Sequence, residues 1–362
     1  MRIMKENDII CLSPFLKIRE SNNIKSVKVM NHLTSRIHII DKKIWEVLTI
    51  ESGKVSREEM VEKIGISLFE KYVEHKILLE KKEVWKVYKP RFIEIETSSY
   101  CNWKCCFCPN SIYNREKEIM PLSLFQLILD RASEYGNIRY ISLHGYNEPT
   151  IEPYFLERVK MIRNAGFKLV LYTNGSGLKK RIIDEIVEIG VVRNVVFNFP
   201  SADADVFFER TGTHMSRQIM EHISYAKSSG LNVSISIQGT REEQCKEEEK
   251  IRKAFPDVAI TAIPSFDRAG ILKNKYCNNI SYKEEYLSGC GFVLTDIHID
   301  VSGHLYLCLE DYHKKHSFGN VKELSLDEIL LSDDYVNIIG QIWGRIPASE
   351  DLICRKCILL GK

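Results

Sequence analysis

Four cysteines lie within residues 101–108, and this cluster constrains the chain more than any other feature. Cys101, Cys105 and Cys108 follow the spacing Cys-x3-Cys-x2-Cys, and Cys106 lies inside the last gap. A loop this short can bring three thiolates to one metal centre. Zinc sites usually add a fourth Cys or His at a matching spacing, so three ligands fit zinc poorly. A cubane iron–sulfur cluster held by three thiolates instead keeps one iron open to chelate a small molecule.

Length and composition limit the number of domains, the classes of partner and the compartment that we expect for this chain. The 362 residues allow one large domain or two to three smaller ones. The net charge of +2 gives no general attraction to nucleic acid, so we expect no nucleic-acid partner. There is no apolar run of membrane-spanning length and no leading signal segment, so we expect no membrane association. Eleven cysteines in a chain without an export signal predict a cytoplasmic protein with metal or redox chemistry.

The central segment, residues 90–270, alternates strand-like and helix-like patterns. Strands are predicted over 92–96, 138–143, 168–172, 195–199, 233–237 and 259–263, and helices over 122–135, 153–165, 180–189, 215–228 and 242–255. This rhythm of βα units predicts an α/β fold whose six parallel strands form a partial (β/α)6 TIM-like barrel. Functional residues in such barrels lie at the carboxyl ends of the strands.

Three motifs follow predicted strands of this barrel directly. They are the cysteine loop, the segment 145–149 (Gly-Tyr-Asn-Glu-Pro) and the segment 172–175 (Tyr-Thr-Asn-Gly). Together they resemble the motifs of radical S-adenosylmethionine (SAM) enzymes. The resemblance implies a [4Fe–4S] cluster on Cys101, Cys105 and Cys108 that binds SAM. It also implies reductive cleavage of SAM to a 5′-deoxyadenosyl radical.

The resemblance further implies a set of SAM contacts. They are Phe107, Gly145, Asn147, Glu148, Asn174, Ser201, Ser236 and Arg268. Gly145 permits a close backbone approach, and the Glu148 carboxylate can accept from the SAM amino group. Asn147 stands where the family more often has Gly, and Asn tolerates the left-handed region. Two positions have another interpretation: Ser201 suits a helix N-cap region, and Arg268 suits a surface ion pair.

The C-terminal segment, residues 271–362, carries a second set of cysteines. Alternation over 296–307 about Gly303 predicts a β-hairpin that returns Cys308 beside Cys290, and a helix over 326–343 leads to Cys354 and Cys357. The arrangement resembles the opening of the SPASM motif with a shortened ending, called a twitch domain. That resemblance implies one auxiliary [4Fe–4S] cluster on these four cysteines. Structural zinc fits the same four ligands, and Cys277 is an alternative ligand.

The N-terminal segment, residues 1–89, has the pattern of a winged-helix-like domain. Short alternating runs over 8–40 predict a small antiparallel sheet, and a strand is predicted over 84–87. Asp41 is a predicted N-cap, Ser56 with Glu59 forms a capping box, and a third helix is predicted over 67–75. The pattern is similar to peptide-recognition elements of peptide-modifying radical SAM enzymes, where a leader peptide adds a strand. A docking or oligomerisation domain and a DNA-binding winged helix are the alternatives.

These features lead to one functional hypothesis and two alternatives. The hypothesis is a radical SAM oxidoreductase that matures a ribosomally made precursor peptide by cross-linking, dehydrogenation or epimerisation. The resemblance implies an electron donor such as flavodoxin or ferredoxin. The first alternative is a radical SAM dehydrogenase of a small sugar or cyclitol. The second is a zinc-binding winged-helix regulator.

Overall fold

A nine-stranded sheet forms the centre of the molecule. The computed structural model describes residues 9–19, 25–265, 267–273, 283–358 and 360. The strand order is β12-β11-β10-β9-β8-β7-β13-β14-β15. Six neighbouring strands are parallel: β7 (Phe92–Ile95), β8 (Tyr140–Ser142), β9 (Lys168–Thr173), β10 (Val192–Asn198), β11 (Val233–Gly239) and β12 (Ala259–Pro264). The predicted α/β partial barrel is confirmed.

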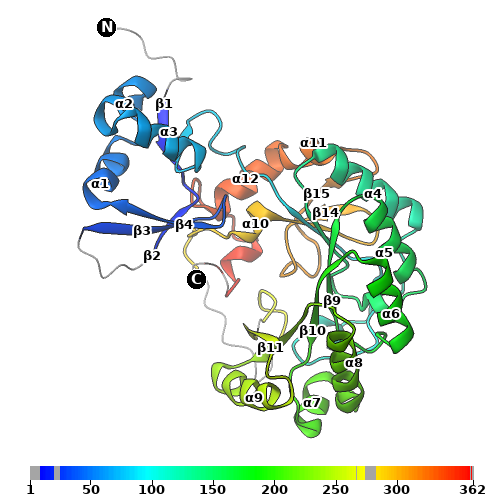
Figure 1. Cartoon of the computed structure of the whole chain (residues 1–362). Coiled ribbons are helices and arrows are strands. Elements are labelled where there is room, and N and C mark those ends of the chain that lie inside the picture. Colours follow the sequence, from blue (N-terminus) through cyan, green and yellow to red (C-terminus); the bar gives the residue numbers. More distant parts are fainter. Residues whose placement is uncertain (1–8, 20–24, 266, 274–282, 359, 361–362) are drawn as a thin grey trace.

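Helices cover the outer face of this curved sheet (Figure 1). They are α4 (Leu122–Tyr135), α5 (Phe155–Asn164), α6 (Lys180–Ile189), α7 (Ala204–Thr211), α8 (Ser216–Ser228) and α9 (Arg241–Ala254). α7 corresponds to the helix implied by the second interpretation of Ser201, although its N-cap is Asp203. The side chain of Asp203 caps this helix by accepting from the amides of Asp205 and Val206.

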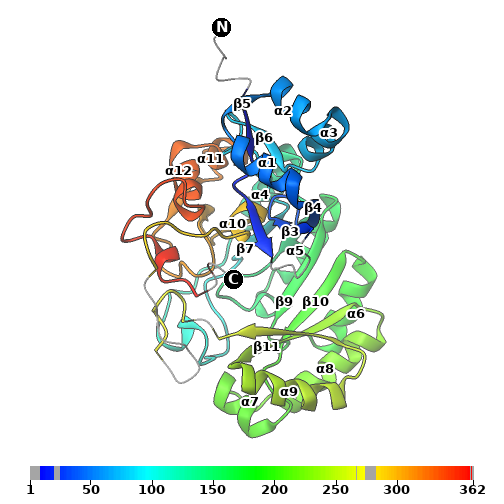
Figure 2. The same ribbon diagram turned by 90° about the vertical axis from the view of Figure 1, so that its left-hand side faces the viewer.

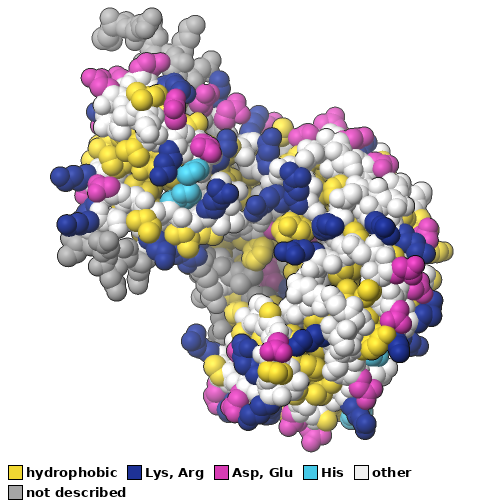
Figure 3. Space-filling model, in the orientation of Figure 1, with side chains coloured by type: hydrophobic (Ala, Val, Ile, Leu, Met, Phe, Trp, Pro, Cys, Tyr) yellow, Lys and Arg dark blue, Asp and Glu magenta, His cyan; other side chains and the backbone are white. Residues whose placement is uncertain are grey.

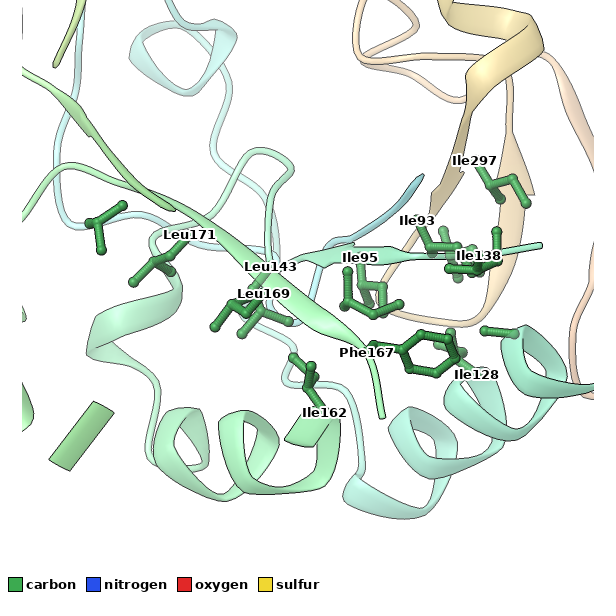
Figure 4. Packing of buried hydrophobic residues seen from close by; sticks show 14 of the residues in the cluster. Ile93, Ile95, Ile128, Ile138, Leu143, Ile162, Phe167, Leu169, Leu171 and Ile297 are labelled. Carbon is green, nitrogen blue, oxygen red and sulfur yellow. The ribbon is translucent and has the colours of Figure 1, made fainter. Parts of the chain in front are cut away.

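The core lies between the sheet and these helices (Figure 4). Ile93 and Ile95 of β7 and Leu169 and Leu171 of β9 are fully buried. Each such side chain contributes about 1.5–3 kcal/mol by leaving water. Because neighbouring residues of a strand point to opposite faces, the intervening Glu94 points to the inside of the barrel. One face of the barrel strands therefore holds the fold together, and the other is free to be polar.

The C-terminal segment continues the same sheet. After α10 (Phe292–Thr295), β13 (Asp296–Ile299) and β14 (His304–Tyr306) form the predicted hairpin, and β15 (Ser317–Asn320) follows. The sequence did not reveal that β13 also pairs in parallel with β7, with Asp296 opposite Phe92. This pairing places the second set of cysteines directly beside the barrel.

The predicted single helix over 326–343 is wrong. The chain forms α11 (Leu326–Leu330) and α12 (Asp333–Ile342), with a break between them. Ser332 causes the break because its hydroxyl accepts from the amide of Tyr335 and caps the second helix. A serine side chain that bonds to the backbone in this way favours a helix start over a helix interior.

The N-terminal domain contains two small sheets, where one was predicted. β1 (Ile9–Leu12) pairs with β5 (Val55–Ser56) and β6 (Leu78–Glu80), and β2 (Leu16–Arg19), β3 (Ser26–Asn31) and β4 (Arg36–Asp41) form the other. The helices are α1 (Lys42–Glu51), α2 (Arg57–Ile64) and α3 (Ile66–Glu74). The Asp41 N-cap and the Ser56–Glu59 capping box are confirmed.

The strand predicted over 84–87 is also wrong. Two successive turns form instead, in which the amide of Glu83 donates to Glu80 and that of Lys86 donates to Glu83. The turns direct Trp85 onto Phe15, with ring centroids 5.5 Å apart. Apolar packing of this tryptophan therefore overrides the local alternation of the sequence.

The N-terminal domain packs directly against the C-terminal segment, beside α10 and α12 (Figure 2). The Phe15 ring also contacts Trp343, edge to face, at 5.1 Å between centroids. The hydroxyl of Tyr88 donates to the carbonyl of Leu330 at 2.5 Å. In the described part of the chain, no helix combines the length and the apolar character that crossing a membrane requires.

Candidate active site

A cavity of about 230 Å³ opens at the carboxyl ends of the barrel strands. Cys101, Cys105 and Cys108 line it together. Seven of the predicted SAM contacts line the same cavity: Phe107, Gly145, Asn147, Glu148, Asn174, Ser236 and Arg268. Segments that are far apart in the sequence therefore meet where a barrel of this kind places its site.

The three cysteine thiols of this cavity are strongly desolvated. Burial raises the pKa of Cys101 to about 12, and Glu148 adds to the effect. Burial and the neighbouring Cys108 and Cys101 raise the pKa of Cys105 far above its usual value. Such thiols deprotonate when iron binds them, because a metal ion supplies the missing positive charge. Three such thiols on one cavity wall, with Cys105 buried and Cys101 and Cys108 partly buried, fit a cubane cluster with one open iron.

Glu148 joins two of the loops around the cavity. Its Oε2 accepts from the backbone amide of Asn174 at 2.6 Å, and its Oε1 accepts from the Thr173 hydroxyl at 2.6 Å. Oε1 also accepts from the amide of Thr150 at 3.1 Å. Burial raises the pKa of Glu148, and these hydrogen bonds oppose the rise. The carboxylate therefore fixes the position of the loop after β9 relative to the loop after β8.

Gly145 has a steric reason to be glycine. A Cβ atom at this position would lie 2.7 Å from the Cβ of Glu96, closer than such atoms ever approach. Glu96 cannot withdraw, because its buried carboxylate accepts from Arg115, from Lys314 and from the amide of Tyr146. The close approach predicted at Gly145 is therefore made to this side chain of the protein.

Asn174 connects the loop after β9 to the cysteine loop. Its amide nitrogen donates to Asn102 Oδ1 at 3.0 Å and lies 3.7 Å from Cys101 Sγ. Ser201, in contrast, lies outside the cavity lining. Its buried hydroxyl donates to Glu247 at 2.5 Å and accepts from the amide of Asp203. In this structure Ser201 shapes the start of α7.

Arg268 is partly buried, with 15% of its side chain exposed, unlike the surface arginine that was its alternative interpretation. Its guanidinium donates to Glu310 at 2.7 Å and lies over the Tyr146 ring, 5.6 Å from the centroid. The residue has a φ of 52°, a strained conformation for arginine. The side chain therefore joins the loop after β12 to the segment that follows Cys308.

Three further residues around the cavity were missed by the sequence analysis. The side-chain amide of Asn110 donates to the backbone carbonyl of Tyr146 at 2.6 Å, and the Tyr312 hydroxyl donates to Asn110 Oδ1 at 3.3 Å. The hydroxyl of Tyr146 donates to the carbonyl of Leu309. These contacts join the cysteine loop, the loop after β8 and the C-terminal segment. No spacing in the sequence signals them, because their partners lie far apart along the chain.

A carboxylate and two histidines lie inside the barrel below the cavity. Oε2 of Glu94 is 3.1 Å from His298 Nδ1 and 3.4 Å from His144 Nδ1. Burial disfavours the ionised carboxylate, but the two imidazoles outweigh burial, and the pKa of Glu94 falls well below its usual value. His144 lines the cavity and stacks on Tyr172 with centroids 4.6 Å apart. His144 therefore links the Glu94 carboxylate to the cavity lining.

The second set of cysteines also converges. Burial raises the pKa of Cys308 far above its usual value, and the nearby Cys354, Cys357 and Cys290 add to the rise. Burial likewise raises the pKa of Cys354, with contributions from Cys290 and Cys357. Cys308 therefore lies near the other three cysteines, of which Cys354 and Cys357 are buried and Cys290 is partly buried, and four such thiols fit a fully cysteine-ligated cluster. Cys277 lies outside the described residues.

The segments that carry the two sets of cysteines match known domain families. The Radical SAM superfamily model matches residues 95–271, and the SPASM iron–sulfur cluster-binding domain model matches residues 290–358. The chain is 33% identical over 101 residues to a tungsten-containing aldehyde ferredoxin oxidoreductase cofactor-modifying protein of Pyrococcus furiosus, and the match spans 28% of each chain. It is 22% identical over 270 residues to the SAM-dependent 2-deoxy-scyllo-inosamine dehydrogenase of Niallia circulans, covering 73% of this chain and 91% of that protein.

Solved structures share the fold at low sequence identity. Streptococcus suis SuiB bound to precursor peptide SuiA matches with a TM-score of 0.60 and 17% identity, covering 97% of this chain and 94% of that one. BtrN in complex with AdoMet and 2-DOIA matches with a TM-score of 0.53 and 19% identity, covering 75% and 93%. The chain therefore contains a Radical SAM domain and, after it, a C-terminal SPASM-type domain, and these domains imply a SAM-binding [4Fe–4S] cluster and an auxiliary cluster.

Proposed function

We propose that Cys101, Cys105 and Cys108 hold the SAM-binding cluster. Cys290, Cys308, Cys354 and Cys357 then hold the auxiliary cluster. The convergence of buried thiols at each place supports this assignment. When bound, the first cluster and SAM supply a one-electron carbon–sulfur cleavage that yields a 5′-deoxyadenosyl radical. The protein's part is to hold SAM in the cavity, to exclude water and to present the substrate.

Glu148 is the residue whose replacement should weaken SAM binding most cleanly. In Glu148→Gln, an amide group replaces a carboxylate that accepts from Thr150, Thr173 and Asn174. At least one buried donor then loses its acceptor, which costs about 1–3 kcal/mol. We expect SAM affinity to fall about tenfold or more, with iron content unchanged. SAM titration followed by the electron paramagnetic resonance (EPR) spectrum of the reduced cluster measures this.

A matched control separates this effect from a general loss of a glutamate. Glu249 on α9 is exposed and pairs with Lys253. Glu249→Gln should bind SAM as the parent does. Unchanged SAM affinity in Glu148→Gln would show that the loop junction at Glu148 does not shape the SAM site.

We infer that the substrate is a ribosomally made peptide that undergoes net oxidation. The observation that carries this proposal is the outer side of β4 in the N-terminal β2-β3-β4 sheet, with which no strand of the described residues pairs. β4 is an edge strand, and Ile37 and Ile39 on it are 54% and 76% exposed. Apolar side chains lie open on this domain in Figure 3. An exposed apolar edge strand suits a peptide that adds a strand, as the resemblance to the peptide-bound SuiB structure also suggests.

Substitutions on this edge test the proposal. Ile37→Glu with Ile39→Glu places two charges where the peptide would pack, so peptide binding should weaken more than tenfold. SAM cleavage without peptide should persist. Fluorescence anisotropy with labelled peptides encoded beside the gene measures binding, and mass spectrometry measures oxidation. Ile50, 61% exposed on α1, provides the control variant Ile50→Glu. Equal peptide oxidation by all three proteins would contradict peptide recognition at β4.

A small cyclitol or sugar is the second candidate substrate. The inside of the barrel favours it, because Glu94, His144, Asn198 and Gln238 place polar groups in or beside the cavity. The match over most of the length of a cyclitol dehydrogenase also supports it. Oxidation of 2-deoxy-scyllo-inosamine that does not depend on Ile37 or Ile39 would favour this candidate over a peptide.

Oxidation by hydrogen-atom removal also releases a proton and an electron. His144 is placed to take the proton, because Glu94 contacts its Nδ1 and leaves Nε2 on the opposite side of the ring. We assign the electron to the auxiliary cluster. The proposed external donor for SAM cleavage is a flavodoxin or ferredoxin, and the proposed compartment is the reducing cytoplasm.

A further inference from the structure

Lys17 of the N-terminal domain reaches into the C-terminal cysteine site. Its ammonium donates to the carbonyl of Gly289 at 3.1 Å, next to Cys290 in the chain. The same ammonium lies 5.9 Å from the centroid of the Trp343 ring. Lys17, His32, Gly289 and Cys290 line one pocket between the two domains. The ammonium is therefore held by two contacts, to the Gly289 carbonyl and to the Trp343 ring, beside a cysteine of the auxiliary site.

Charges of both signs surround this site, because Arg355 and Lys356 lie between Cys354 and Cys357 and Arg268 pairs with Glu310. Burial is the main cause of the raised pKa of Cys290; Lys17 opposes the rise and Asp296 adds to it. Burial is also the main cause of the raised pKa of Cys308 and of Cys354, and Glu310 and Asp311 respectively add smaller contributions. A reduced cluster carries one more negative charge than an oxidised one. Nearby carboxylates therefore oppose reduction, and a nearby ammonium favours it.

We propose that Lys17 is a positioning residue that raises the reduction potential of the auxiliary cluster, so that the N-terminal domain sets how readily this cluster accepts an electron. The step concerned would be the transfer of one electron from the substrate radical to an oxidised cluster on these cysteines, with the substrate's proton going to the proposed acceptor His144 and no bond formed or broken in the protein. Lys17 acts through its charge and through the place that Gly289 and Trp343 give it. The inference rests on the proposed cysteine ligands and is independent of the identity of the substrate.

Redox titration of the full-length protein tests this directly. The Cys101→Ala, Cys105→Ala, Cys108→Ala background should retain only the auxiliary cluster, so its EPR signal can be followed alone. In this background we compare the midpoint potential of the protein that retains Lys17 with the potentials of the variants Lys17→Met, Lys17→Gln and Lys17→Arg. We set the potential at which half of the auxiliary cluster is reduced in the protein that retains Lys17. At this potential, the auxiliary cluster of the Lys17→Met and Lys17→Gln variants should stay mostly oxidised. The cluster of the Lys17→Arg variant should be about half reduced.

Each variant separates one explanation from another. Gln can still donate to Gly289 but carries no charge, so a Gln variant with the parent's potential would overturn the charge effect. Arg19 lies two residues along β2 and is exposed, and Arg19→Met should leave the potential unchanged. Equal potentials for all variants that retain about four irons per chain would overturn the proposal. A colourless protein with zinc at this site would overturn it too, while leaving the peptide-binding result at β4 unaffected.

Discussion

Replacing Cys101, Cys105 and Cys108 together with Ala should abolish formation of 5′-deoxyadenosine. The three thiols line one cavity with the proposed SAM contacts, so their loss removes the cluster at which SAM would bind. Iron should fall from about eight per chain to about four, the content of one cubane cluster. Anaerobic incubation with SAM and dithionite, followed by chromatography of the products, measures the activity.

Two other cysteines provide the controls. Cys245 is exposed on α9, and Cys106 lies in the cysteine loop off the ligand spacing. Cys245→Ser and Cys106→Ser should both retain iron and SAM cleavage. If the triple variant still produced 5′-deoxyadenosine, the assignment of the radical chemistry to this loop would be wrong.

Replacing Cys354 and Cys357 with Ser should separate SAM cleavage from substrate oxidation. These two cysteines belong to the set that converges with Cys290 and Cys308. Loss of the auxiliary cluster removes the proposed electron acceptor, so 5′-deoxyadenosine should still form while oxidised product disappears. Iron should again fall from about eight to about four per chain. Iron analysis and mass spectrometry of the product give the two readouts.

The opposite outcomes are equally informative. A native protein with about four irons and one zinc would make the C-terminal site structural. Undiminished product from the double variant would show that the substrate electron leaves by another route. Because SAM cleavage is measured in the same reaction, a protein that fails to fold is recognised by the loss of both activities.

Much of the barrel was predictable because its signals are local. The helices over 122–135 and 180–189 have the predicted bounds, since apolar residues recur there at helical spacing and a glycine ends each helix. The cysteine loop and the segment 145–149 were recognisable because each compresses several functional residues into a few positions. Seven of eight expected SAM contacts consequently line one cavity.

The remaining features depend on contacts between distant segments. Nothing local indicates that β13 adds to β7, because a strand's partner is chosen by topology. Ser201 was expected to contact SAM, but its hydroxyl meets Glu247, which lies on α9 and approaches only in the folded chain. The same is true of Glu94, whose partners His144 and His298 come from two other parts of the sheet. Such clusters become visible only when the strands are assembled.

The Phe15 ring packs between Trp85 and Trp343 and so influences which residue of a bound peptide would be modified. Together with the hydrogen bond from Lys17 to Gly289, this packing joins the β2-β3-β4 sheet to the wall of the C-terminal site. A peptide that adds to β4 would therefore begin its path to the cavity from a fixed starting point. An extended chain advances about 3.3 Å per residue, so the number of residues between the bound leader and the cavity selects the modified residue. The fixed contact between the domains would therefore set the distance along the peptide from the bound leader to the modified residue.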